Sequence, residues 1–512
     1  MSQALQGGVR LKFSGIMTYI ANMTTLLVNI SFTIILTRKL TVEDYGLWQV
    51  IGALASYFLT WIPITYTYWI TRDVARGDYD SARTGTVVSL LLGTTSSICY
   101  IVISMIFIER LSSSLWYFGL YSIAVLITFC YTPYQATAWG IKPEHIGFSE
   151  IVSTIVKVII GYFLIVTIGL GLYGAILAFM GYSFSKYLYY RAKIGKILQL
   201  GNVKAKIVKK WLSKAWIPLS NTVAHSLVQL DIAVVALVTA STIPLAYYRV
   251  VQFYSQLLWN TITISIGMYP LLLSSTEERA SKILKESINL VALIALPMAT
   301  GIFVMAEHLL ALLRVDYVVN SHAVRLGVVY AILMITVSIV YRTLIGMEKV
   351  DVDIKATFRD YLKSTLFTAA IGRLIIPATV LPALFFASLI FAFKPVELVI
   401  YWYIFYIVGY AAYLLYLIRL AKVNKLAIKV DFKTLTAMVI SSIVMGLLLS
   451  IFSGMIEVSE KFVVEVYNLL MLFLLGSSSY FSLLYATCGW FRSFLKDALA
   501  FLKHWRQSRS IN

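Results

Sequence analysis

The sequence predicts an all-α polytopic membrane protein of about 14 transmembrane helices, built as two pseudo-symmetric six-helix bundles plus two accessory helices. Three observations support this prediction: 60% of the 512 residues are hydrophobic and 13% charged, apolar runs of membrane-spanning length recur, and a polar pattern repeats after about 200 residues. Soluble domains usually contain roughly 25% charged residues. The composition therefore excludes a soluble enzyme and a disordered chain.

Apolar runs of about 18 or more residues are long enough to cross the hydrocarbon core of a bilayer. The predicted spans lie at approximately 15–37, 47–70, 85–108, 115–133, 150–168, 172–190, 215–239, 246–272, 288–306, 323–345, 364–392, 397–418, 434–456 and 462–486. Most of the 43 Lys and Arg residues fall in alternate loops, which predicts that both termini are cytoplasmic.

The spans and loops predict five segments along the chain. They are a first six-helix bundle (1–190), a basic cytoplasmic linker (191–214), a second six-helix bundle (215–418), two accessory helices (419–486) and a basic cytoplasmic tail (487–512). The net charge of +19 resides in loops, and no folded basic module is present, so nucleic-acid binding is not expected. We interpret the linker as a topogenic segment that rests on anionic lipid headgroups.

Polar side chains form stripes along the predicted spans. Residues three and four apart share one face of a helix. The stripes of spans one and two recur about 200 residues later in spans seven and eight, which favours a polar cleft shared by two related bundles over separate interhelical hydrogen bonds. The stripe residues predicted to line this cleft are Asn22, Thr25, Asn29, Gln49, His225, Gln229, Arg249, Gln252, Gln256 and Asn260.

Charges inside the spans are costly and therefore informative, at about 2.5–3.5 kcal/mol each unless they are paired or hydrated. Lys157, Arg249 and Arg373 are predicted to add positive charge to the cleft, where they would attract a phosphate. Three further cations are close enough to span ends to reach the interface by snorkelling: Lys186, Arg325 and Arg342.

Asp231 is, by this assignment, the only acidic residue deep in a span. Two interpretations remain open: an ion pair with Arg249 or Arg373, or a site for a coupling cation such as H⁺ or Na⁺. The histidines and the three cysteines have no spacing typical of metal ligands or of a disulfide framework, so no metal site is predicted.

Four short segments resemble the polysaccharide-transport (Wzx-type) flippases of the multidrug/oligosaccharidyl-lipid/polysaccharide (MOP) superfamily. They are LTVEDYGLWQV at 40–50, TRDVARGDYDSAR at 71–83, GLGLYGAILA at 169–178 and AYYRV at 246–250. Thr41 also fits a helix N-cap, and the three glycines of 169–174 fit a tight turn between closely packed helices better than a nucleotide site.

The resemblance implies a transporter and not an enzyme, with no catalytic residue and no cofactor. The expected activity is translocation of a polyprenyl-(pyro)phosphate-linked oligosaccharide across the cytoplasmic membrane of a prokaryote by alternating access, for surface polysaccharide or glycoprotein assembly. The membrane lipid and a functional association with glycosyltransferases are the further partners. Two alternatives remain: a cation-coupled exporter of drugs or amphiphiles from the same superfamily, and a membrane glycan-transferring enzyme or polymerase, with Glu307 and Asp316, or Glu457 and Glu460, as its acid pair.

Overall fold

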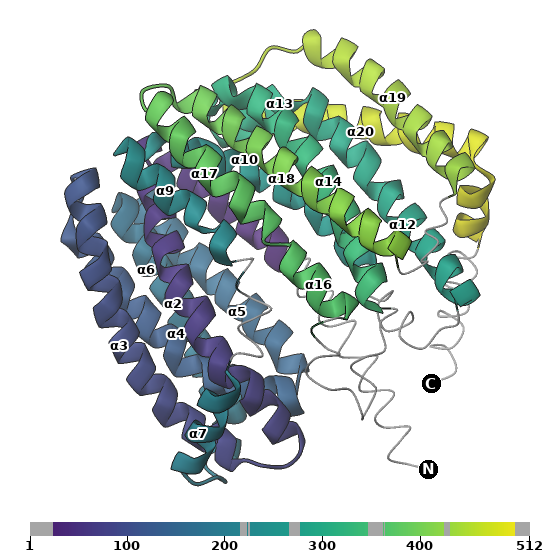
Figure 1. Cartoon of the computed structure of the whole chain (residues 1–512). Helices are drawn as coiled ribbons and strands as arrows, with labels where there is room; N and C mark the ends of the chain where they lie inside the picture. The colour runs from purple at the N-terminus through teal and green to yellow at the C-terminus, as the bar shows by residue number, and fades with distance from the viewer. Residues whose placement is uncertain are drawn as a thin grey trace, which may run out of the picture. The chain divides into compact units, whose positions relative to one another are not determined.

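Long apolar helices make up both parts of the chain in the computed structural model, which describes residues 24–215, 223, 226–265, 277–346, 362, 364–423 and 431–496 (Figure 1). The described chain divides into two compact units: unit 1 comprises Met1–Ala246 and Leu384–Pro395, and unit 2 comprises Tyr247–Ala383 and Val396–Asn512. The all-α prediction is confirmed. The division into five segments stays a prediction.

Unit 1 begins with a helix at 24–39, which precedes a series of long helices. These helices are α2 (Val42–Ala75), α3 (Asp80–Leu111), α4 (Leu115–Ile141), α5 (Glu144–Gly161), the π-helix η1 (Tyr162–Thr167), α6 (Gly171–Leu198), α7 (Ala205–Lys214) and α9 (Leu230–Thr239). Helix α4 packs against α2, α3 and α6, and α5 packs against α6.

Unit 2 holds most of the remaining helices; the first residues of α10 and the segment Leu384–Pro395 at the end of α17 are assigned to unit 1. Its helices are α10 (Ile243–Trp259), η2 (Asn260–Ser265), α12 (Glu277–Val304), α13 (Ala306–Leu313), η3 (Val315–Asn320), α14 (Ser321–Gly346), α16 (Thr365–Gly372), α17 (Ile375–Ile390), α18 (Pro395–Val423), α19 (Phe432–Gly454) and α20 (Phe462–Thr487). The last two helices pack against each other, and α19 also packs along α12.

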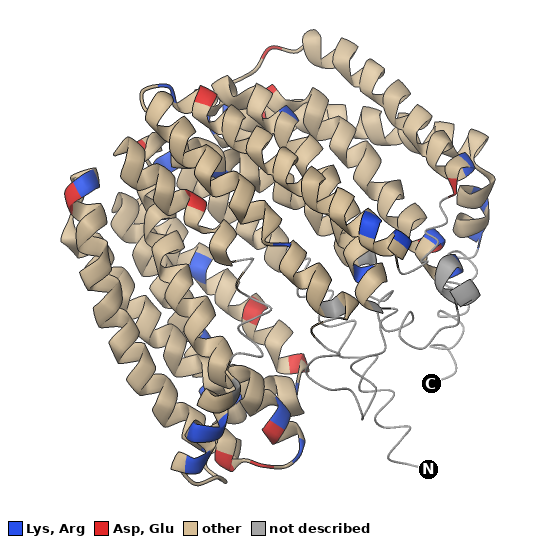
Figure 2. Ribbon diagram, in the orientation of Figure 1, with Lys and Arg blue, Asp and Glu red and all other residues tan. Residues whose placement is uncertain are grey.

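Ten helices within the described ranges are long and apolar enough to cross a membrane. Parts of predicted spans one, seven and eight fall outside the described residues, and the helix at Ser226–Thr239 is a shorter apolar segment. Figure 2 shows that most of the helical surface carries no charge and that Lys, Arg, Asp and Glu gather near helix ends.

Helix α3 shows how these sequences pack in a membrane. Its buried face consists mainly of small residues such as Ser89, Gly93 and Ser96, whereas Leu91 and Ile98 on the other face are 65% and 58% exposed. A Cβ atom at Gly93 would lie 2.6 Å from the Cβ of Phe129 on α4. Small residues thus let the helices approach closely, and the large apolar side chains face outward, as lipid-exposed helices require.

Two local predictions are confirmed. The Thr41 hydroxyl accepts a hydrogen bond of 3.0 Å from the Asp44 amide and caps α2. Gly169 and Gly171 have positive φ angles of 79° and 53° in the turn before α6, and a Cβ atom at Gly174 would lie 2.8 Å from Ile165. The glycines therefore serve the turn and the close helix packing that follows it.

Candidate functional site

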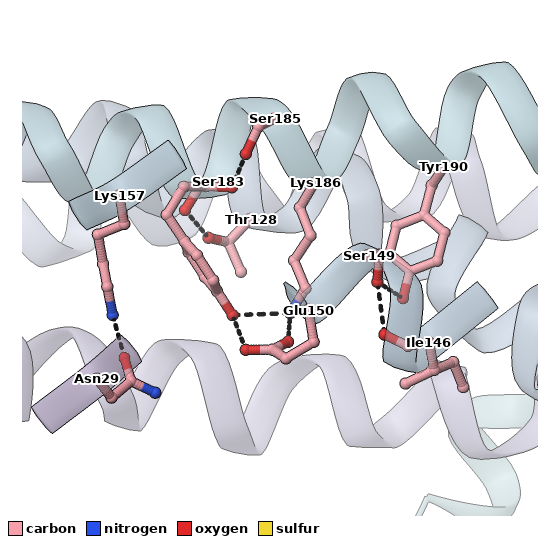
Figure 3. Close-up of polar contacts among 11 residues, drawn as sticks. Asn29, Thr128, Ile146, Ser149, Glu150, Lys157, Ser183, Ser185, Lys186 and Tyr190 are labelled. Atoms are coloured by element: carbon pink, nitrogen blue, oxygen red, sulfur yellow. Dashed lines mark hydrogen bonds and ion pairs between the residues drawn. The ribbon is translucent and has the colours of Figure 1, made fainter. Parts of the chain in front are cut away.

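Five side chains from three helices of unit 1 form a polar site between membrane-spanning segments, which we call the lysine cluster (Figure 3). Its members are Asn29, Glu150, Lys157, Tyr182 and Lys186. Glu150 and Lys157 lie two turns apart on α5 and therefore share one helical face. Tyr182 and Lys186 are one turn apart on α6, and Asn29 comes from the helix at 24–39.

A closed triangle of polar contacts joins α5 to α6. The Lys186 ammonium lies 2.6 Å from Glu150 Oε2, and it donates a hydrogen bond of 2.8 Å to the Tyr182 hydroxyl. The Tyr182 hydroxyl in turn donates to Glu150 Oε1 at 2.8 Å. Because Lys186 is only 5% exposed, this ion pair compensates a charge that could not otherwise be buried.

Lys157 has neutral neighbours instead. Its ammonium donates a hydrogen bond of 2.6 Å to Asn29 Oδ1 and lies 4.9 Å from the ring centre of Phe32 and 5.4 Å from that of Tyr182. An amide oxygen and aromatic faces stabilise a cation without cancelling its charge. Within the described residues, no carboxylate lies within ion-pair distance of Lys157, so the lysine cluster holds two cations and one anion.

Backbone features bring the helix at 24–39 close to Lys157. A Cβ atom at Gly161 would lie 2.6 Å from Phe32 Cε2, so the glycine makes room for the ring that covers the lysine. The π-helix η1 starts at Tyr162, directly after this glycine. Such π-helical turns are rare and are frequently found at functional sites.

The interpretation of Lys186 as a snorkelling residue was wrong. Its side chain points into the bundle and pairs with Glu150, which sequence analysis placed at the edge of a span and left unused. Asp231 is not the only buried acid within a predicted span, because Glu465 in the first turn of α20 is fully buried. The i,i+7 and i,i+4 spacings within α5 and α6 were visible in the sequence, whereas the pairing of these helices was not.

We expect Glu150→Gln to lower the free energy of unfolding by about 2 kcal/mol. Loss of one partner of a buried ion pair typically costs about 3–5 kcal/mol, and the 30% exposure of Glu150 reduces this value. Unfolding of the purified protein in mixed micelles would measure the change. Tyr182→Phe is the matched control, because it removes hydrogen bonds and leaves the charges in place. An effect of Glu150→Gln no larger than that of Tyr182→Phe would contradict the prediction.

Other predicted cleft residues of unit 1 lie at several places. The Thr25 hydroxyl is buried and makes no hydrogen bond within the described structure. Gln49 is buried on α2, where its side chain bonds to the carbonyl of its own helix at Tyr45. Gln229 accepts a hydrogen bond of 3.2 Å from Ser56 Oγ, which joins the predicted stripe of span two to that of span seven.

Asn22 and His225 lie outside the described residues. Asp231 is 3% exposed at the start of α9, where its Oδ1 accepts a hydrogen bond of 2.7 Å from the Ile232 amide. Both interpretations of Asp231, the ion pair and the cation site, stay predictions. No group of three or more His, Cys, Asp or Glu side chains within the described ranges is arranged to hold a metal ion.

The predicted residues of unit 2 form two small groups. Arg249 donates a hydrogen bond to Gln252 Oε1 one turn later on α10. Gln256 is exposed on the same helix, and Asn260 begins η2. Arg373 lies between α16 and α17 with its guanidinium 4.7 Å from the ring centre of Tyr341. Their role in a cleft stays a prediction.

One of the two candidate acid pairs of a glycan-transferring enzyme, Glu307 and Asp316, has cationic partners of its own. Glu307 pairs with Arg325 at 3.1 Å, and Asp316 pairs with Arg314 at 2.6 Å. Both acids are about half exposed. They behave as surface ion pairs, which are of little energetic consequence.

Comparison with solved structures identifies the fold. The structure of the lipid II flippase MurJ in an inward closed conformation matches with a TM-score of 0.65 and 13% identity, over 94% of this chain and 99% of that chain. An inward-facing multidrug resistance MATE family transporter of the MOP superfamily matches with a TM-score of 0.58 and 12% identity, over 80% of this chain and 99% of that chain. No family model and no curated protein matches the sequence. The chain therefore has the fold that this flippase and this MATE family transporter share.

Proposed function

We propose that the protein is a flippase that translocates a polyprenyl-(pyro)phosphate-linked oligosaccharide across the cytoplasmic membrane by alternating access, for surface polysaccharide or glycoprotein assembly. The observation that carries this proposal is the surplus positive charge of Lys157, which lies in the middle of the candidate span Glu144–Thr167. A charge near mid-membrane costs at least about 2.5 kcal/mol without a counter-ion. A phosphate of the substrate would supply that counter-ion during transport.

The sign of this charge separates the two transporter candidates. An anionic lipid phosphate gains from a lysine that has only amide and aromatic neighbours, because a charge-assisted hydrogen bond is strong where water is scarce. A cationic drug would be repelled by the same group. The fold is shared with a flippase and with a multidrug transporter, so it supports transport in general, and the lysine cluster favours the anionic substrate.

The mechanism follows from this charge balance. The phosphate binds the Lys157 ammonium and replaces Asn29 as its hydrogen-bond acceptor, while the prenyl chain stays in lipid. The Glu150–Lys186 pair holds α5 and α6 together and keeps Lys157 in place. Nothing in this cycle needs covalent chemistry, and whether H⁺ or Na⁺ drives the return step depends on Asp231, which we keep as the coupling candidate.

Deletion of the gene followed by lipid extraction tests the proposal. We expect a saccharide-linked lipid to accumulate on the cytoplasmic face, where added glycosidase cannot reach it in intact cells, and the surface glycan to decrease. Complementation with the wild-type gene serves as the control and should restore both. Unchanged lipid intermediates together with altered drug susceptibility would contradict the flippase and support the exporter. Loss of glycan polymerisation with normal lipid translocation would instead support the enzyme.

A further inference from the structure

Helix α7 forms the end of the basic linker and is fastened to the cytoplasmic ends of α2 and α3. Its Trp211 is 2% exposed and lies 6.4 Å, between ring centres, from Tyr66 of α2. The adjacent residue, Lys210, forms an ion pair of 3.0 Å with the buried Asp73 of α2. Helix α7 therefore has an inner face that belongs to the core of unit 1.

The segment that leads into α7 is fixed equally well. A Cβ atom at Gly201 would lie 2.2 Å from the Tyr79 carbonyl oxygen, so only glycine permits this close approach. The Asn202 amide donates a hydrogen bond of 2.7 Å to Asp80, and Lys204 forms an ion pair with the same carboxylate. The hydrogen bond between the Lys204 ammonium and the Asp80 carboxylate raises the pKa of Lys204 above its ordinary value. Asp73 is thus paired with Lys210, and Asp80 with Lys204.

The outer face of α7 has a different composition. Lys206 and Lys209 are exposed on it, and Leu212, about 60° further round the helix from Lys209, is 72% exposed. The preceding turn adds Leu200 and Val203, which are 69% and 55% exposed. Large apolar side chains interleaved with lysines on one face are typical of helices that lie in the membrane interface.

The position of α7 along α2 places this face at the depth of the headgroups. Trp211 packs near Tyr66 and Trp69 of α2. These two residues lie in the last apolar turns of the helix, just before Arg72, where the charged C-terminal end of α2 begins. Aromatic side chains at such a boundary mark the interface between hydrocarbon and water. Helix α7 therefore lies beside the point where α2 leaves the membrane, as Figure 1 shows at the lower ends of α2 and α3.

We infer that the outer face of α7 is a docking surface for anionic phospholipid headgroups of the cytoplasmic leaflet. Charge complementarity supports this occupant, because further exposed cations lie on or next to the ends of α2, α3 and α6, and Figure 2 shows Lys and Arg, together with Asp and Glu, at the end of unit 1 that holds α7. These neighbouring exposed cations are Arg72, Arg76, Arg83, Arg191, Lys193 and Lys196. Leu200, Val203 and Leu212 would enter the apolar region below the headgroups, a contact that a free anion could not provide.

A fluorescent probe on the outer face tests this inference. The three cysteines are free, so the full chain with Cys99→Ala, Cys130→Ala and Cys488→Ala accepts one NBD label through Leu212→Cys. In detergent micelles titrated with dihexanoyl phosphatidylglycerol, we expect a blue shift of NBD emission that dihexanoyl phosphatidylcholine does not cause. Each lysine near an anionic surface contributes about 1 kcal/mol to binding. The double variant Lys206→Gln with Lys209→Gln should therefore raise the phosphatidylglycerol concentration at the midpoint of the titration about 30-fold.

The matched control removes two exposed cations elsewhere. Arg419→Gln with Lys422→Gln, in the last turns of α18, changes the net charge equally and should leave the midpoint unchanged. The test variants keep Lys204 and Lys210, so the attachment of α7 to Asp80 and Asp73 is preserved. Equal shifts in both double variants, a shift caused by phosphatidylcholine or by inorganic phosphate alone, or no shift with phosphatidylglycerol would each overturn the inference.

Discussion

Glu465→Leu is expected to lower the free energy of unfolding by about 4 kcal/mol, because it removes a fully buried carboxylate from its partners. Glu465 Oε1 lies 2.6 Å from His308 Nδ1, and its other oxygen accepts hydrogen bonds of 2.9 Å from the Ser459 amide and 3.4 Å from Asn468. The substitution leaves the histidine and the amide without this acceptor. Unfolding of the purified protein in mixed micelles would measure the loss.

Two further variants separate the ion pair from simple loss of packing. The double variant His308→Leu with Glu465→Leu removes both polar partners and should recover part of the stability, because apolar residues can replace a buried pair at little cost. Glu457→Gln changes an exposed acid near the same end of α19 and should have almost no effect. A double variant as unstable as the sum of the two single variants would show that the pair does not act as a unit.

The His308–Glu465 contact fastens α20 to α13 and so makes the last two helices part of unit 2. Sequence analysis described these helices as accessory, because they lie outside the 200-residue repeat. Hydropathy could not reveal the contact, since its two residues are 157 positions apart, with His308 just after one predicted span and Glu465 near the start of another. The structure shows that this contact holds α20 in unit 2. Among the acids that form ion pairs within the described residues, Glu465 is the most deeply buried.

The sequence predicts some features of the fold well and others poorly, for physical reasons. The all-α character, the Thr41 cap and the glycine turn before α6 depend on local chemistry and are confirmed, and ten of the described helices are long and apolar enough to cross a membrane. The pairing of Lys186 with Glu150 depends on which helices are neighbours, and periodicity within one helix carries no such information. The position of Lys157 within a span is visible in the sequence, but its contact with Asn29 is visible only in the structure.

Lys157→Met is expected to reduce transport of the lipid-linked oligosaccharide about 10- to 100-fold while leaving the protein at least as stable as the wild type. The first effect follows from loss of a charge-assisted hydrogen bond to phosphate, which is worth about 1.5–3 kcal/mol. The second follows because Met removes a partly buried cation that has no acidic partner and keeps the apolar length of the side chain. Transport into vesicles and unfolding in micelles, measured on the same preparations, give both values.

Asn29→Asp tests the charge itself with almost no change of shape. A carboxylate 2.6 Å from the Lys157 ammonium would form an ion pair within the membrane, so we expect greater stability together with transport as low as in Lys157→Met. Lys157→Arg keeps the charge and should retain more activity than either variant. If Asn29→Asp transports at the wild-type rate, or if Lys157→Met is inactive only because it unfolds, the surplus cation does not bind the substrate. Its cost to the folded protein would then need another explanation.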